Sequence, residues 1–290
     1  MPGTRARTRR AGEAGSKVAR LLAAYDAEVR LAVPDPLPPG VAYEWDGPVL
    51  RSTGGRRGFV VARDLTGTDE AELDELIARQ IRHYAARGEE FEWKTWSHVG
   101  PAVLTDRLVA AGFQPGPVET VLLAVAAPLT RDPPLPEGVR LRTGTADDLA
   151  GIAALYEVVW SEDQAARVAA LGRRLVTTPA SLDLVVAEHD GRVIGSGRVD
   201  YEGGSRFASL WGGSVHPDWR HRGVYRASVA WRARLAVAHG KSALQADAAP
   251  TSRPILERLG FVVAASTTPY VRGPADPLSE TVPILNCQVS

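Results

Sequence analysis

The chain has 290 residues, enough for two domains that each bury a core, and its 34 basic residues balance 34 acidic ones. This balance argues against an overall field that recruits nucleic acid or a membrane surface. One cysteine, Cys287, excludes an internal disulfide and a zinc site with several cysteines, and it fits the reducing cytoplasm, where we expect the protein. No apolar run reaches the length of about 18 residues that spans a bilayer, so we expect no membrane partner.

The first half of the chain predicts a mixture of helices and strands. Residues 1–15, rich in arginine, predict a disordered start, and 16–127 predict an N-terminal domain. Apolar residues at helical spacing predict helices at 18–29, 69–85 and 104–111, and apolar runs predict strands at 42–45, 58–62 and 118–125. Residues 91–94 alternate apolar and polar side chains, which predicts a half-buried strand.

A proline-rich stretch at 128–137 predicts a stiff linker to a second domain at 138–290. The Thr145 capping box predicts the start of a helix, and Asp190-Gly191 predicts a hairpin turn. The expected order is one strand, two helices, three antiparallel strands, then helix, strand, helix and strand. These elements are expected at 139–142, 149–160, 164–175, 182–188, 192–200, 208–215, 223–235, 243–246, 252–259 and from 261, with a last strand at 281–289.

The junction from Gly212 to Arg226 is basic and contains glycine, where a strand turns into a helix. A helix start carries backbone N–H groups without intrahelical partners and a positive dipole end, which favours an anion. From Ser214 to Leu235 there are five arginines against one acid, Asp218. The junction therefore predicts a cradle for phosphate or pyrophosphate, although it matches neither common nucleotide motif.

The same stretch resembles a known motif. Residues 215–223, Val-His-Pro-Asp-Trp-Arg-His-Arg-Gly, resemble the acyl-CoA motif V-x-P-x-x-[RQ]-x-x-G-x-[GA] of the GNAT superfamily of N-acetyltransferases. Residues 252–261 end in Leu-Gly-Phe and are similar to the late helix of that family. The resemblance covers roughly 139–270. It implies an α/β (α+β) fold with a mixed, mostly antiparallel central sheet flanked by helices.

Residues 106–113 echo 254–261 about half a chain length earlier, each ending a helix at a glycine followed by phenylalanine. Two interpretations stay open. The N-terminal half is a degenerate copy of the same fold, giving a tandem pair, or the echo is a coincidence. We expect no CoA binding there, because the half has no counterpart of the basic cradle.

The resemblance implies acetyl-CoA as the acyl donor. The backbone of Gly213, Ser214 and Val215 would pair with the pantetheine arm as an added strand. The N–H groups and arginines of the helix start would hold the pyrophosphate; these residues are Arg220, His221, Arg222, Gly223, Val224, Tyr225 and Arg226. Tyr225 departs from the family, which has Gly or Ala at that position.

The resemblance identifies catalytic residues less directly than it identifies cofactor-binding residues. Many members use a tyrosine of the late helix as general acid, but Leu256 stands at that position, and Ser252 or Tyr270 would have to substitute. Candidate bases are carboxylates near strand ends, namely Asp200, Glu202 and Asp247. His216 lies at a variable position that faces away in the family. No group of residues has metal-ligand spacing, so no metal is expected.

The sequence thus predicts an N-acetyltransferase that transfers acetyl from acetyl-CoA to an amine of a small molecule or peptide by direct attack. The alternative is a non-catalytic acyl-CoA-binding or structural protein that kept the fold; Leu256 and Tyr225 favour it. Nucleic-acid binding is a distant third hypothesis. The sequence does not identify the acceptor or the oligomeric state.

Overall fold

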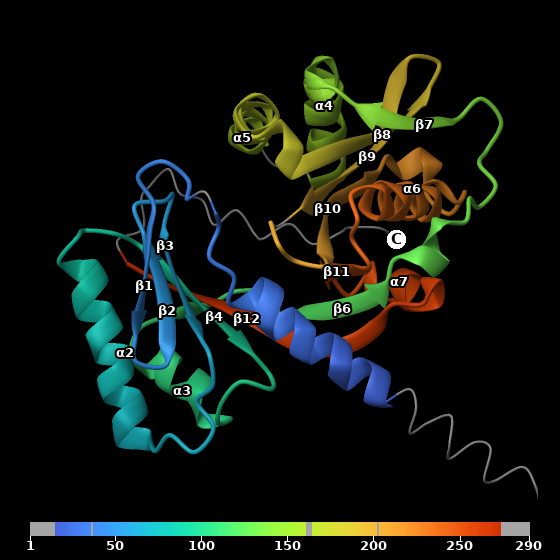
Figure 1. The fold of residues 1–290 in the computed structure, drawn as a ribbon. Helices are drawn as coiled ribbons and strands as arrows, with labels where there is room; N and C mark the ends of the chain where they lie inside the picture. The colour runs from blue at the N-terminus through green and yellow to red at the C-terminus, as the bar shows by residue number, and fades with distance from the viewer. Residues whose placement is uncertain (1–14, 36, 161–163, 202, 274–290) are drawn as a thin grey trace, which may run out of the picture. The chain divides into compact units, whose positions relative to one another are not determined.

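A computed structural model describes residues 15–35, 37–160, 164–201 and 203–273. The described residues form two compact units (Figure 1). One, the GNAT-motif unit, contains 15–29 and Thr120–Ala264; the other, the β1–β4 unit, contains Arg30–Glu119 and 265–273. The two units are defined by packing, and each contains segments from both halves of the chain. The expected domains 16–127 and 138–290 therefore stay a prediction.

The β1–β4 unit is a sheet with two helices. Its strands are β1 (Ala42–Asp46), β2 (Val49–Thr53), β3 (Gly58–Ala62), β4 (Phe91–Trp96), β12 (Val262–Arg272) and the short β5 (Gln114–Pro115), and its helices are α2 (Glu70–Ala85) and α3 (Val103–Ala110). The order is β1-β2-β3-β4-β12, with β5 on β12. Strands β3 and β4 run parallel and the other pairs antiparallel. The last strand therefore comes from the C-terminal end of the described chain.

Two features of this unit differ from the sequence predictions. Strand β2 was not expected; it pairs with β1 across a tight turn at Gly47, whose φ is +60°. The expected half-burial of β4 is wrong, because Glu92 and Lys94 are 5 % and 7 % exposed. Ion pairs make this burial possible: Arg57 lies 3.4 Å from the Glu92 carboxylate, and Lys94 lies 3.6 Å from Glu119.

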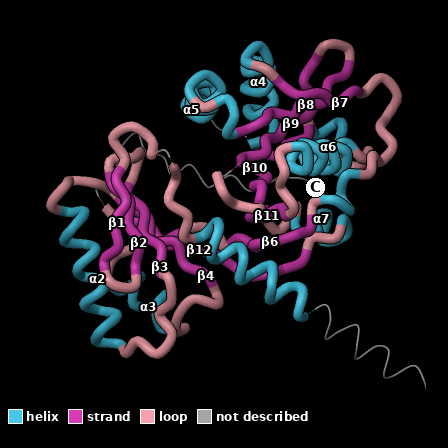
Figure 2. The backbone as a smooth tube through the Cα atoms, viewed as in Figure 1, coloured by secondary structure: helices cyan, strands magenta, loops and turns pink. Residues whose placement is uncertain are grey.

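From β7 to β12 the chain has the predicted order of elements (Figure 2), although most of β12 belongs to the β1–β4 unit, and the GNAT-motif unit adds β6 from before the proline-rich stretch. Its elements are β6 (Glu119–Val125), β7 (Arg140–Gly144), α4 (Leu149–Trp160), α5 (Ala165–Thr177), β8 (Leu182–His189), β9 (Arg192–Tyr201), β10 (Phe207–Val215), α6 (Val224–Ala238), β11 (Ala243–Ala248) and α7 (Arg253–Leu259). The sheet order is β6-β11-β10-β9-β8-β7, and β10 with β11 is its parallel pair. The mixed, mostly antiparallel sheet flanked by helices is confirmed.

Alternation along the strands gives this sheet two covered faces. On β8, Leu184 and Val186 pack in one apolar cluster with Ile152 and Leu155 of α4. Ala187 packs in a second cluster with Val224 and Val229 of α6, together with Leu256 of α7. Helices α4 and α5 thus cover one face, and α6 and α7 cover the other, because neighbouring strand residues point to opposite faces.

Local signals in this unit behave as the sequence predicted. Thr145 and Asp148 form the reciprocal capping box before α4. Asp190 and Gly191 both have positive φ, +48° and +73°, as the two central residues of a tight hairpin turn require.

The proline-rich stretch 128–137 does more than connect. A 3₁₀ turn, η2 (Ala127–Thr130), contacts α6, and Leu129 is 8 % exposed in the α6 cluster. Arg234 of α6 donates to the carbonyl of Thr130 at 3.2 Å and pairs with Asp132. Burial and these bonds fix the stretch on the GNAT-motif unit.

The N-terminal helix, residues 15–25 followed by the π-helical turn η1 (Asp26–Arg30), also packs on this unit. The ring of Tyr25 meets Phe207 of β10 edge-on at 6.2 Å, and Glu28 pairs with Arg206 at 2.7 Å. The expected disordered start lies outside the described residues except for Gly15, and the strand expected at 281–289 lies outside them too. Within the described ranges, no helix combines the length and apolarity that crossing a membrane requires.

Candidate functional site

Strands β10 and β11 part after a short parallel pairing. Phe207, Ala208 and Ser209 pair with residues 243–245, whereas β10 continues to Val215. Between Trp211 and Ser214 the pairing of β10 with β9 is shifted by a bulge, in which Gly212 has φ +59°. The edge of residues 213–215 that faces β11 is therefore outside the parallel ladder. Such an edge can pair with an extended ligand.

The start of α6 lies directly after β10. Gly223 at its N-cap is left-handed, with φ +87°, and His221 before it is left-handed too, with φ +60°. Among the described residues no side chain caps this end, so the helix start presents its N–H groups and dipole to a ligand. A Cβ on residue 223 would come within 3.2 Å of the Pro134 carbonyl oxygen, which explains why glycine is required here.

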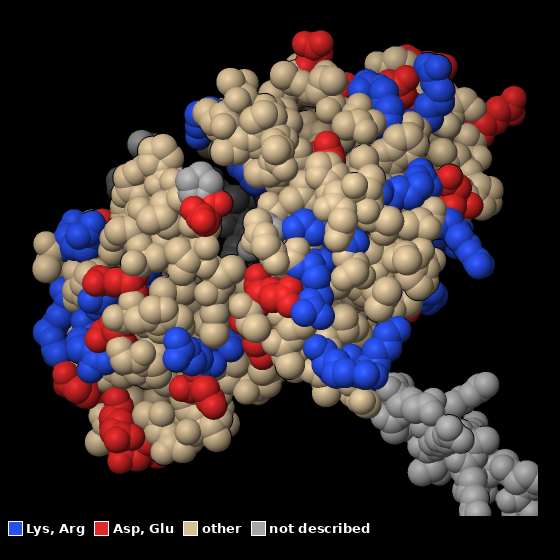
Figure 3. All heavy atoms as spheres, in the orientation of Figure 1, with Lys and Arg blue, Asp and Glu red and all other residues tan. Residues whose placement is uncertain are grey.

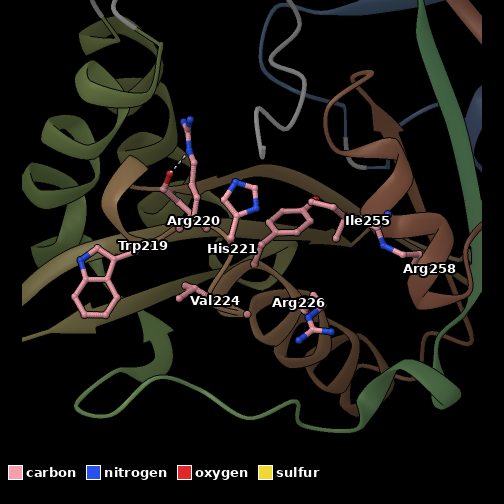
Figure 4. Close-up of a pocket in the computed structure, with 10 residues that line it drawn as sticks. Trp219, Arg220, His221, Val224, Arg226, Ile255 and Arg258 are labelled. Atoms are coloured by element: carbon pink, nitrogen blue, oxygen red, sulfur yellow. Dashed lines mark hydrogen bonds between the residues drawn. The ribbon is translucent and has the colours of Figure 1, made fainter.

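A cavity of about 210 Å³ opens at this helix start (Figure 4). It is lined by Val215, Trp219, Arg220, His221, Gly223, Val224, Tyr225, Arg226, Ile255 and Arg258. Arg220 lies in the turn before α6 and Arg226 lies in its first turn, while Ile255 and Arg258 come from α7 (Figure 4). The Arg220 Nε atom donates to the Val215 carbonyl at 3.3 Å. Three guanidinium groups and a helix dipole thus surround one small cavity, an arrangement suited to phosphate oxygens.

The structure brings seven of the ten predicted cofactor residues to this cavity. Gly213, Ser214 and Arg222 do not line it; the first two lie on the β10 edge, and the Arg222 guanidinium lies over the Trp219 ring at 5.1 Å. The sequence interpretation missed Trp219, Ile255 and Arg258. For the last two a signal existed: they stand three residues apart in the late-helix motif, which places both on one helix face.

Tyr225 is the departure from the family pattern. Its side chain is 6 % exposed, and the guanidinium of Arg232, two turns later on the same face of α6, lies 5.9 Å from its ring centre. The ring therefore packs into the α6 cluster while it also forms part of the cavity wall.

Neither Ser252 nor Tyr270, the two residues that would have to replace the family's general acid, is well placed for that role. Ser252 is fully buried and donates its hydroxyl proton to the Ala249 carbonyl at 3.3 Å. Leu256, 1 % exposed, belongs to the α6 cluster. Tyr270 lies in the β1–β4 unit, opposite Trp93 of β4, where burial raises its pKa.

The candidate bases differ in their surroundings. Asp200 accepts from Arg174 at 2.9 Å and from Arg198 at 3.0 Å, so both oxygens are engaged by cations. Asp247 on β11 is 7 % exposed. It follows Gln245 by two residues and shares its face of the sheet, away from α6. Glu202 lies outside the described residues.

This face of the sheet is polar and buried. Gln245 donates to the Ser209 hydroxyl at 3.0 Å across the β10–β11 pair. Its Oε1 atom, and the Oγ atom of Ser196 on β9, are buried and have no hydrogen-bond partner among the described residues. Buried polar atoms are nearly always paired, so unpaired ones beside the parting of two strands indicate a place for a polar ligand.

His216 keeps apart from the cavity, as expected: its Nδ1 atom accepts from the Asp218 N–H at 3.3 Å. Within the described ranges, no group of three or more His, Cys, Asp or Glu side chains could hold a metal. On the face shown in Figure 3, basic and acidic side chains are intermixed.

Comparison with known proteins agrees with the motif. Residues 150–261 match the model of the acetyltransferase (GNAT) family, so the chain contains a GNAT acetyltransferase domain over these residues. No curated protein sequence matches the chain.

Three solved structures are similar in fold over most of the chain. A GCN5-related N-acetyltransferase from Kribbella flavida has a TM-score of 0.61 at 16 % identity, covering 82 % of this chain and 91 % of its own. A tandem GNAT protein of the clavulanic acid biosynthesis pathway has a TM-score of 0.57 at 15 % identity, covering 81 % and 84 %. A GCN5-related N-acetyltransferase from Sphaerobacter thermophilus has a TM-score of 0.56 at 13 % identity, covering 78 % and 76 %.

Proposed function

We propose that the chain is an acyl-CoA-dependent N-acyltransferase that uses acetyl-CoA as its donor. The observation that carries this proposal is the parting of β10 and β11 directly before an uncapped helix start ringed by arginines. The family match over 150–261 supports it.

Different groups of the chain would bind different parts of the cofactor. The β10 edge at Gly213, Ser214 and Val215 would pair with the amides of the pantetheine arm. The helix start at Gly223 and the guanidinium groups of Arg220 and Arg226 would hold the pyrophosphate. Arg258, which the motif does not include, would add a cation from α7. Acetyl-CoA supplies an acyl group activated as a thioester.

Asp247 is the base that we favour for the acceptor amine. Its carboxylate lies on the buried polar face of the sheet, two residues after Gln245 and beside the parting of β10 and β11. A base must lie within hydrogen-bond reach of the proton it removes, and this position beside the parting strands would allow that. Direct attack would draw most of its rate from positioning the amine and the thioester together.

The acceptor is proposed only as an amine of a small molecule or peptide. The partly unpaired polar face near Ser196 and Gln245 supports a polar acceptor. The cysteine usage supports a cytoplasmic location.

A second function is favoured by two residues. Leu256 stands in the core where the family places a proton donor, and the Tyr225 ring forms part of the cofactor cavity. A non-catalytic acyl-CoA-binding protein with this fold would bind CoA and never transfer its acyl group.

The test is calorimetric titration of acetyl-CoA into the native chain and into Gly223→Val. A valine at φ +87° is strained, and its side chain would meet the Pro134 carbonyl and fill the helix start. We expect micromolar to millimolar binding by the native chain and none by the variant. Release of free thiol in the presence of a panel of primary amines then separates a transferase from a non-catalytic binder.

Gly240→Val is the matched control. Gly240 follows the other end of α6, has φ +73°, and has open space where its Cβ would be. It carries the same backbone strain without touching the cavity, so it should bind acetyl-CoA as the native chain does. Equal binding by all three proteins, or loss in both variants, would contradict the cofactor site.

A further inference from the structure

The face of the sheet away from α6 is covered by α4, which carries a tyrosine close to β10. Tyr156 of α4 is 4 % exposed. A Cβ built on Gly212 would lie 3.1 Å from its hydroxyl oxygen, so the hydroxyl lies against the backbone of the β10 bulge. This bulge stands between the last residue that pairs with β11 and the free β10 edge at 213–215.

The ring of Tyr156 is held from two sides. Trp160, one turn later on α4, lies 4.3 Å away between ring centres. Arg167 of α5 places its guanidinium 6.0 Å from the Tyr156 ring and 5.4 Å from the Trp160 ring. With its ring fixed by these contacts, the hydroxyl has little freedom to leave the bulge, which is the preorganisation that a proton donor needs.

Three other candidate proton donors are held elsewhere. Tyr201 donates to the Asp183 carboxylate at 2.7 Å, Ser252 bonds to a carbonyl, and Tyr270 lies in the other unit. Leu256 has no proton to give. Tyr156 is a phenol whose hydroxyl lies against the bulge.

We propose that the Tyr156 hydroxyl is the catalytic proton donor to the sulfur of the departing CoA. This assignment rests on the proposed function. The amine nitrogen bonds to the acyl carbon, and the carbon–sulfur bond breaks with its electron pair going to sulfur. Tyr156 passes its proton to that sulfur, and the proton that the amine loses to Asp247 or solvent returns to the phenolate. The products are an amide and free CoA thiol.

The experiment needs no known acceptor. Calorimetry would compare CoA with desulfo-CoA, which lacks the sulfur, on the full chain. A hydroxyl that donates to the sulfur favours CoA, and a hydrogen bond to an ionised partner corresponds to about tenfold or more in affinity. We therefore expect the native chain to bind CoA about tenfold more tightly than desulfo-CoA above pH 8. Tyr156→Phe, which keeps the ring contacts with Trp160 and Arg167, should bind the two equally.

Tyr201→Phe is the control, because it removes a phenol hydroxyl from the same unit that bonds to Asp183 instead. It should keep the native preference for CoA. An unchanged preference in Tyr156→Phe, or no preference in the native chain, would overturn the assignment while leaving the cofactor site intact. If the native chain binds neither compound, the proposed function itself fails and the assignment fails with it. Melting temperatures of all variants check that each is folded.

Discussion

Tyr156 and Gly212 form a close contact, and a larger residue at position 212 would have to displace the tyrosine hydroxyl. A Cβ there would lie 3.1 Å from the Tyr156 hydroxyl oxygen, closer than most real Cβ contacts, and φ of Gly212 is +59°. Backbone conformation and close approach of α4 both require glycine at the bulge. The bulge that frees the β10 edge is thus linked to the packing of α4.

Gly212→Ala should lower the free energy of unfolding by about 2 to 4 kcal/mol. Roughly 1 kcal/mol comes from a non-glycine residue in the left-handed region, and about 1 to 3 kcal/mol from overpacking against Tyr156. Urea denaturation measures the loss. Gly191→Ala is the control, because Gly191 has φ +73° with open space around its Cβ position. Gly191→Ala should lose only the roughly 1 kcal/mol that the left-handed conformation costs. Equal losses in Gly191→Ala and Gly212→Ala would show that the Tyr156 contact has no effect on stability.

Arg232 should be replaceable by methionine without loss of stability. Its side chain is 0 % exposed, its Nε atom donates to the Ser228 carbonyl at 3.2 Å, and its two terminal nitrogens have no hydrogen-bond partner within the described residues. A buried charge without a counter-charge costs several kcal/mol, which an apolar side chain of similar length avoids. Arg232→Met should therefore keep or raise the midpoint of urea unfolding.

Arg232→Ala gives the comparison. It removes the same charge but leaves a cavity against Gly197, whose Cβ position lies 3.1 Å from the guanidinium carbon. The alanine variant should lose about 2 to 5 kcal/mol of unfolding free energy relative to methionine. If both variants lose the same amount, the guanidinium rather than its volume stabilises the unit.

The capping box before α4 should make stability depend on pH in the acid range. Hydrogen bonds from the Arg142 guanidinium, at 2.6 and 2.8 Å, lower the pKa of Asp148, and the Thr145 N–H at 2.8 Å adds to this effect. The ionised carboxylate is therefore favoured in the folded chain. This contribution is complete above the unfolded pKa of about 4 and is lost as pH falls through the lower folded value.

The difference in unfolding free energy between the native chain and Asp148→Asn should therefore become smaller as pH falls from 5 to 3. Urea midpoints of native and variant chains at several pH values measure this difference. Asp147→Asn, at an exposed neighbour without an ion pair among the described residues, should show no such convergence. A constant deficit of Asp148→Asn at all pH values would mean that its carboxylate charge is not what stabilises the cap.

Much of the GNAT-motif unit was predictable because its signals are local. The Asp190-Gly191 turn, the Thr145 cap and the glycine at 223 each act within a few residues, and the structure has all three as expected. The geometry of the basic junction was predictable for the same reason: a strand, a basic turn and a helix start are contiguous in sequence.

The sequence predictions failed where a residue's surroundings depend on partners that lie far away in the sequence. Burial of Glu92 and Lys94 follows from Arg57 and Glu119, which periodicity along β4 cannot reveal. Strand β12 lies beside β4 although some 170 residues separate them in sequence, as the Thr267–Trp96 pairing illustrates. The role inferred for Tyr156 depends in the same way on Gly212, a residue of another element.

Tyr225→Ala should bind acetyl-CoA more tightly than the native chain while unfolding more easily. The ring forms part of the wall of the cavity at the start of α6, where the resembled motif has Gly or Ala, and its removal widens the cavity without touching the backbone N–H groups of α6. The same ring is 6 % exposed, so its loss should cost about 3 to 5 kcal/mol of unfolding free energy. Calorimetry with acetyl-CoA and urea denaturation measure the two effects. Tyr225→Phe keeps the ring and should not bind acetyl-CoA more tightly than the native chain. Weaker binding by Tyr225→Ala would show instead that the ring is a wall on which the cofactor packs, and the departure from the family pattern would then be a feature of recognition.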